Sequence, residues 1–154
     1  MIYKTDLATL EKEDHLQHEV FGPCSIVTEC SSKEDMLRFA RSLQGQLTAT
    51  LHGTPEDLAE HADLVRILER KVGRLIFNGF PTGIEVCPSM HHGGPYPAAT
   101  HSFFTSIGTG SIYRFVRPVC YQNFPDAALP ELITNANQRG CTRLVDGVLT
   151  KDNA

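Results

Sequence analysis

Apolar positions in the first half of the chain follow two different periods. Short, β-branched or apolar runs are typical of buried strands, and they occupy residues 24–28, 47–52 and 74–78. Residues 31–45 and 54–73, which lie between these runs, place apolar side chains three or four positions apart, as one buried helix face requires. The order strand, helix, strand, helix, strand predicts parallel strands joined by helices that cross over them.

The expected helices have clear start signals. Ser31 and Ser32 are each followed three residues later by an acid, and Thr54 is followed by Pro55 and then by two acids. Such side chains satisfy the free amides of a first helical turn, and proline suits its first position. We expect these helices to end at Gly45 and Gly73. Three parallel strands need cover on both faces, so we expect them to form part of a larger sheet.

The second half of the chain has a different sequence pattern. Residues 79–97 are rich in glycine, proline and histidine without a period, and a loop of this length inside a domain is usually functional. Residues 111–121 alternate as a strand, which Pro118 confines to a sheet edge or a bulge. The remaining residues predict a short helix followed by a terminal strand or tail.

Composition narrows the range of partners. The chain has 154 residues, a net charge of -4 and no run of lysine or arginine, so a nucleic acid partner is not expected. No apolar run approaches the roughly 20 residues of a membrane helix, and the charged start differs from a signal peptide. Five widely spaced cysteines without a secretion signal indicate reduced thiols in a cytoplasmic protein.

Candidate chemistry in single residues is sparse. Cys87, His91, His92 and His101 carry zinc-ligating atoms, but their spacing would not aim three of them at one point, so we expect no metal site. Cys24 has no nearby base in the sequence to activate it, which favours a buried inert thiol. No glycine-rich phosphate-binding motif occurs. Composition and spacing alone therefore indicate an α/β domain with a functional loop.

A resemblance adds to this interpretation. The segment Glu19-Val20-Phe21-Gly22-Pro23 resembles the E-[VI]-F-G-P segment of NAD(P)-dependent aldehyde dehydrogenases. The later segments FNGFPTGIEVCPSMHHGGPYPAATH, YRFVRPVCYQNFP and RLVDG are similar to the branch that contains α-ketoglutarate semialdehyde (2,5-dioxopentanoate) dehydrogenases and NADP-linked fatty aldehyde dehydrogenases. The resemblance covers nearly the whole chain.

The resemblance implies a fold and an organisation. Residues 1–110 would form the C-terminal part of a catalytic domain, a three-layer α/β/α structure with a mainly parallel sheet. Residues 111–154 would supply an edge strand within Ile112–Tyr121 and a tail, which together make subunit contacts in a homo-oligomer. The implied activity is oxidation of a semialdehyde or aliphatic aldehyde to a carboxylic acid with NAD or NADP.

The resemblance also implies roles for single residues. Glu19 would hydrogen-bond the hydroxyls of the nicotinamide ribose, and Phe21 would pack against the nicotinamide end of the cofactor. Thr82, Ile84 and Val86 would line the entrance for the substrate. The family's nucleophile is a cysteine in a glycine-glutamine-x-cysteine context, which attacks the aldehyde to form a thiohemiacetal. No cysteine of this chain has that context, so we expect no catalytic residue in it and no activity of the chain alone.

Two other classes remain open at this stage. The chain could be a non-catalytic regulatory or interaction module derived from the same domain. It could also be a metal-binding regulator that uses the histidine-containing loop.

Overall fold

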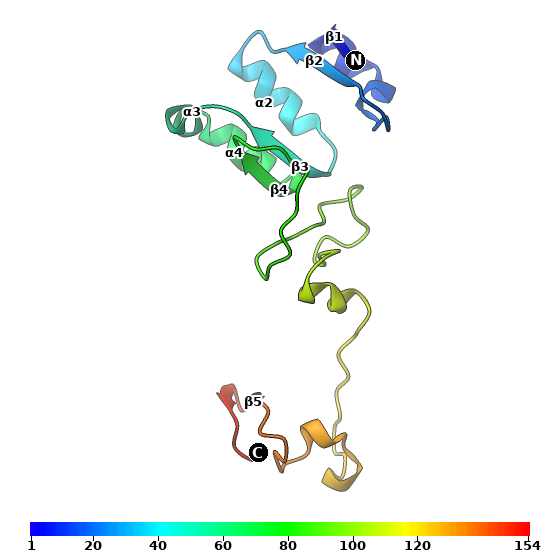
Figure 1. Cartoon of the computed structure of the whole chain (residues 1–154), viewed down its shortest axis with the longest axis vertical. Coiled ribbons are helices and arrows are strands. Elements are labelled where there is room, and N and C mark those ends of the chain that lie inside the picture. Colours follow the sequence, from blue (N-terminus) through cyan, green and yellow to red (C-terminus); the bar gives the residue numbers. More distant parts are fainter. The chain divides into compact units, whose positions relative to one another are not determined.

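The computed structural model describes all residues, 1–154, and divides them into two compact units, Met1–Phe115 and Val116–Ala154. The α-helices and parallel strands all belong to the first unit, and the second unit holds short 3-10 helices and a small antiparallel pair of strands (Figure 1). The α/β class expected from the sequence is therefore confirmed.

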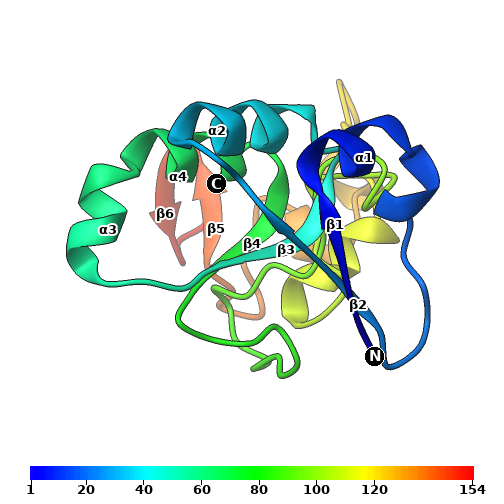
Figure 2. The ribbon, with the colours of Figure 1, turned by 90° about the horizontal axis from the view of Figure 1, so that it is seen from above.

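The chain begins with a strand that the sequence pattern did not predict. Strand β1 (Ile2–Asp6) pairs in parallel with β2 (Ser25–Glu29), and Ile2 lies opposite Ser25 (Figure 2). Between these strands come α1 (Leu7–Lys12) and a 3-10 helix at Asp14–Gln17. Asp6 caps α1 by accepting a hydrogen bond from the amide of Thr9, with a distance of 2.8 Å.

The main core lies between two helices and a second parallel pair of strands. Strands β3 (Gln46–Leu51) and β4 (Val72–Phe77) pair with each other, and α2 (Lys33–Ser42) and α4 (Ala62–Leu68) pack together beside them (Figure 1). The buried members of this core are Leu37, Ala40, Leu64 and Leu68. Ala49, Leu51 and Leu75 pack against them, so the helices cover one face of the strand pair.

The helix starts agree with the sequence signals, but neither expected helix end does, since α2 ends at Ser42, before Gly45. Ser32 caps α2, and Thr54 and Asp57 form a reciprocal capping box at the start of α3 (Pro55–Glu60). The single helix expected over 54–73 is wrong, because it breaks at His61 into α3 and α4. Gly73 does not end a helix but lies inside β4.

The strands form two separate two-stranded sheets. The three strands expected in one sheet are split, since β2 pairs with β1 and β3 pairs with β4. The expectation of a single sheet over these strands is wrong for the chain on its own. The predicted parallel pairing through helical connections is confirmed within each pair, because both pairs are parallel and helices connect the two strands of each.

Residues 79–97 contain no helix or strand, as expected, but the strand expected at 111–121 is wrong. Thr109–Arg114 form a 3-10 helix, and the residues after it up to Pro125 have no regular structure. Local bonds explain the helix, because Ser111 donates both its amide and its hydroxyl to the carbonyl of Gly108. Pro118 cannot donate to a sheet, and these residues have no partner strand.

The second unit is stabilised mainly by polar contacts. The hairpin of β5 (Arg143–Val145) and β6 (Val148–Thr150) turns at Asp146 and Gly147, both of which have positive φ. Short 3-10 helices at Asp126–Ala128 and Glu131–Ile133 replace the predicted helix. The Arg143 guanidinium donates to the carbonyls of Thr134, Asn135 and Asp152 and so connects the hairpin to the preceding loop. No helix of the chain has the length and apolar character needed to cross a membrane.

Candidate functional site

The segment with Glu19 and Phe21 lies between the 3-10 helix at Asp14–Gln17 and β2. Its start is fixed by His18, which ends the helix and lies 3.4 Å from the Asp14 carboxylate, measured from Nε2. Its end is fixed at Pro23, whose carbonyl accepts a hydrogen bond from the amino group of Met1. The ends are therefore anchored to the fold, while the side chains between them are exposed.

Both candidate cofactor contacts are free to meet a ligand. The side chain of Phe21 is 92% exposed, and Glu19 is exposed without an ion-pair partner. A free carboxylate can accept from two vicinal hydroxyls, and an exposed ring can pack on a planar heterocycle. Both side chains therefore have the chemistry expected of a ribose contact and a ring contact, and their cofactor roles stay predictions.

A hollow of about 630 Å³ lies beside this segment, over β1 and β2. Its walls mix apolar and titratable side chains, among them Tyr3, His15, His18, Val20 and Cys24. Neither Glu19 nor Phe21 lines it. The hollow therefore gives no support to the predicted roles of these two residues.

The candidate substrate contacts lie in the loop that follows β4. Thr82 is exposed, Ile84 is half-buried and Val86 is 70% exposed. The loop is fixed by Arg74 of β4, which donates to the carbonyl of Pro81 at 3.0 Å and to that of Gly83 at 3.3 Å. These two carbonyls flank Thr82, so the guanidinium fixes the backbone on both sides of it.

A later part of the same loop crosses the starts of β3 and β4 at very close range. A Cβ added to Gly73 would collide with the carbonyl oxygen of Gly93, and one added to Gly94 would collide with that of Gln46. Gly45 has the same relation to the carbonyl of Pro95. Only glycine allows backbones to approach so closely, which accounts for the paired glycines of the loop.

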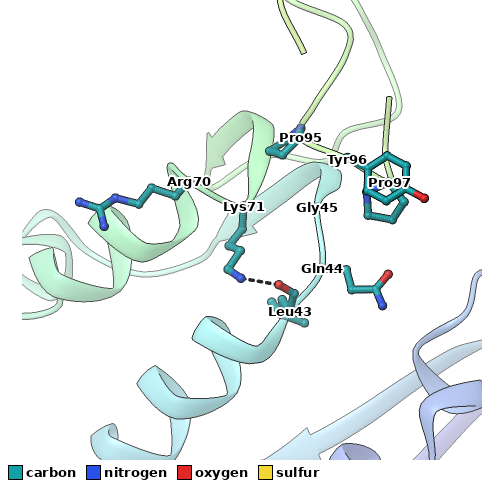
Figure 3. Close-up of a pocket in the computed structure, with 8 residues that line it drawn as sticks. All are labelled: Leu43, Gln44, Gly45, Arg70, Lys71, Pro95, Tyr96 and Pro97. Atoms are coloured by element: carbon teal, nitrogen blue, oxygen red, sulfur yellow. Dashed lines mark hydrogen bonds between the residues drawn. The ribbon is translucent and has the colours of Figure 1, made fainter. Parts of the chain in front are cut away.

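This crossing borders a hollow at the end of α2 (Figure 3). Lys71 donates to the carbonyl of Leu43 at 2.6 Å and so caps α2, while Arg70 extends away from Tyr96 and Pro97 (Figure 3). The polar groups of this hollow do not converge on one point, and none of the five predicted contacts lines it. It therefore does not qualify as the functional site.

The histidines and cysteines do not gather into a cluster of metal ligands. The structure contains no group of three or more histidine, cysteine or acidic side chains that could hold a metal ion. All five cysteines are free, and Cys87 shares a 3.3 Å hydrogen bond with the hydroxyl of Ser89.

The structure does not bring the two groups of predicted contacts together. Glu19 and Phe21 precede β2, Thr82, Ile84 and Val86 follow β4, and no hydrogen bond joins the two segments. Sequence reasoning also missed Arg74, which it treated only as the first residue of a strand. The available signal was a charged residue at the start of an otherwise apolar strand, a few residues before a proline- and glycine-rich loop.

Two known dehydrogenases are similar to this chain. No family model matches the chain. Two curated relatives are dehydrogenases, which confirms the resemblance expected from the sequence. The alpha-ketoglutaric semialdehyde dehydrogenase of Acinetobacter baylyi is 51% identical over 137 residues, which is 89% of this chain and 26% of that protein. Alpha-ketoglutaric semialdehyde dehydrogenase 2 of Azospirillum brasilense is 45% identical over 146 residues, which is 95% of this chain and 28% of that protein. The chain thus spans about a quarter of the length of the relatives it matches.

Proposed function

We propose that the chain is the C-terminal portion of the catalytic domain of an NAD(P)-dependent aldehyde dehydrogenase that oxidises α-ketoglutarate semialdehyde or a related aliphatic aldehyde to the acid. The observation that carries this proposal is the identity of 51% over 89% of the chain with a protein named for that substrate. We further propose a three-layer α/β/α arrangement for the whole domain and a cytoplasmic location, which suits the five free thiols.

The chain's own residues would bind and orient the reactants. The cofactor would accept the hydride of the aldehyde. Glu19 would accept hydrogen bonds from both ribose hydroxyls, and Phe21 would limit where the nicotinamide ring can lie. Thr82, Ile84 and Val86 would guide the aldehyde, and their presentation from one loop fixed by Arg74 supports this role.

The nucleophile would come from outside these 154 residues. None of the five cysteines stands in the nucleophile context of the family, and their side chains are spread over four separate segments of the two units. The chain alone is therefore expected to produce no reduced nicotinamide from an aldehyde. Its residues 111–154 would contribute to subunit contacts in a homo-oligomer, which is supported by the exposed apolar side chains of Ile112, Tyr113, Phe115 and Val119.

The test of the cofactor role is Glu19→Gln in the natural gene product. Loss of a charge-assisted hydrogen bond is expected to raise the KM for NAD(P) by about 10- to 100-fold. Glu60→Gln is the matched control, because Glu60 is an exposed glutamate on α3, away from the segment that carries Glu19. An unchanged KM in Glu19→Gln, or a gene product with no aldehyde oxidation, would refute the proposal.

A non-catalytic module is the second candidate, and the missing nucleophile context is what favours it. The intact mass of the natural gene product separates the two candidates. A mass near the 17.0 kDa of this chain supports the module, and a mass several times larger supports the enzyme.

A further inference from the structure

Arg74 differs from the other basic residues of the first unit because its side chain donates to two main-chain carbonyls, whereas Lys33 and Lys71 each donate to one. Its guanidinium donates to two main-chain carbonyls, those of Pro81 and Gly83, and its Nη1 also lies 3.9 Å from the sulfur of Met90. Lys4 and Arg38 instead pair with carboxylates. Arg74 thus contacts the loop backbone and does not pair with a charged side chain.

The two carbonyl acceptors suit an arginine at this position. A guanidinium is a planar fork with five donors that can hold two separate carbonyls at fixed positions, whereas the three donors of an ammonium rotate about a single nitrogen. Arg74 is half-buried, and its Nε has no hydrogen-bond partner and no solvent contact. A buried donor without a partner is costly. The contacts made by Nη1 and Nη2 must offset that cost.

We propose that Arg74 is a positioning residue, which sets the backbone on both sides of Thr82 and thereby determines how well the loop accepts an aldehyde. The part that concerns the aldehyde rests on the proposed function. The part that concerns the loop does not, because it follows from the contacts of Arg74 alone. Arg74 itself is not expected to touch the substrate, since its donors are directed to the loop backbone.

The first experiment tests whether Arg74 orders the loop. The ¹⁵N heteronuclear NOE of the backbone amides is measured in the 154-residue chain. In Arg74→Met the values at residues 82–84 are expected to fall, while those in β3 and β4 stay unchanged. In Arg74→Lys the NOE values at residues 82–84 are expected to fall to an intermediate level, because the ammonium can donate to the carbonyls but lacks the rigid fork that fixes both of them. Arg66→Met is the matched control, since Arg66 is an exposed arginine on α4.

Kinetics of the natural gene product give the second readout. Arg74→Met is expected to raise the KM for α-ketoglutarate semialdehyde on the order of tenfold with little change in kcat, as expected when binding is lost equally in the ground and transition states. The KM for NAD(P) is expected to stay constant. A residue with a merely structural role would change both KM values together.

Several results would overturn the inference. They are unchanged NOE values in the loop of Arg74→Met, loss of order in β4 in both Arg74 variants, and an unchanged KM for the aldehyde. A wild-type gene product without dehydrogenase activity would overturn the proposed function and with it the role in aldehyde selection. In that case the NMR result would still decide whether Arg74 orders the loop.

Discussion

Asn78 and Gly53 pair with each other across the ends of β3 and β4. The side-chain oxygen of Asn78 accepts from the amide of Gly53 at 2.9 Å, and its side-chain nitrogen donates to the carbonyl of Gly53 at 2.8 Å. The amide of Asn78 also donates to Leu51, and its φ is 50°. One asparagine thus continues the strand ladder and begins the loop that carries Thr82.

Asn78→Ala is expected to lower the free energy of unfolding by about 1–2 kcal/mol, because it removes two hydrogen bonds and puts a Cβ residue without compensating contacts in the left-handed region. Asn78→Gly separates the two effects, since it removes the side chain but tolerates positive φ. Urea titration followed by far-UV circular dichroism suits a chain without tryptophan. Equal stability of the wild type and Asn78→Ala would contradict the pairing.

Gly73→Ala is expected to lower the free energy of unfolding by about 2 kcal/mol or more, because the added methyl group collides with the carbonyl of Gly93. Gly22→Ala is the matched control, because a Cβ at Gly22 meets no atom within 4 Å. The same urea titration measures both variants. A neutral Gly73→Ala would show that the loop does not cross β4 at this distance.

The capping box at α3 predicts a dependence of stability on pH. The amide of Thr54 donates to the Asp57 carboxylate at 2.7 Å and lowers the pKa of Asp57 below its ordinary value of 3.8. The folded state therefore holds this proton less tightly than the unfolded state. The stabilisation is fully present well above pH 3.8 and is lost as the pH falls below that value.

Asp57→Asn tests this dependence. The difference in urea midpoint between wild type and Asp57→Asn is expected to be largest near neutral pH and to shrink on acidification. Glu34→Gln, an exposed acid in the first turn of α2, is the control for general charge effects. A difference that stays constant down to pH 2 would rule out the contribution of the capping box.

The β1–β2 pair predicts self-association. Ile2, Ile26 and Val27 are 77%, 40% and 46% exposed, and a two-stranded sheet has unpaired backbone groups along both outer edges. The mass measured by light scattering is therefore expected to rise with protein concentration. Ile26→Glu is expected to shift the chain toward the monomer, and Arg41→Gln, an exposed change on α2, is not. A strict monomer at high concentration would contradict this prediction.

The sequence predicted the features whose partners are close along the chain. Thr54 and Asp57 are three residues apart, so the capping box and the start of α3 could be recognised directly. Strand β1 could not, because its residues IYKTD are few and largely polar and lack the apolar, β-branched run by which β2 was recognised. The strand expected at 111–121 failed for the opposite reason, since its alternation had no partner strand and local bonds to Gly108 took precedence.

The residues of the candidate site also differ in how far the sequence could predict them. Glu19, Phe21, Thr82, Ile84 and Val86 were identified by resemblance, and their binding roles stay predictions. Arg74 was missed because its acceptors lie seven and nine residues away and are main-chain carbonyls, which leave no mark in the residue types. Periodicity detects which face of an element is buried, but it does not detect which backbone a long side chain reaches.

The close crossing of Gly45, Gly73 and Gly94 has a genetic consequence. Glycine and alanine codons differ by a single base, so at each of these three sites one point mutation is enough to push the loop away from the starts of β3 and β4. A single-base change at any of these glycines, none of which is itself a candidate substrate contact, is therefore expected to alter the shape of the loop that carries those contacts.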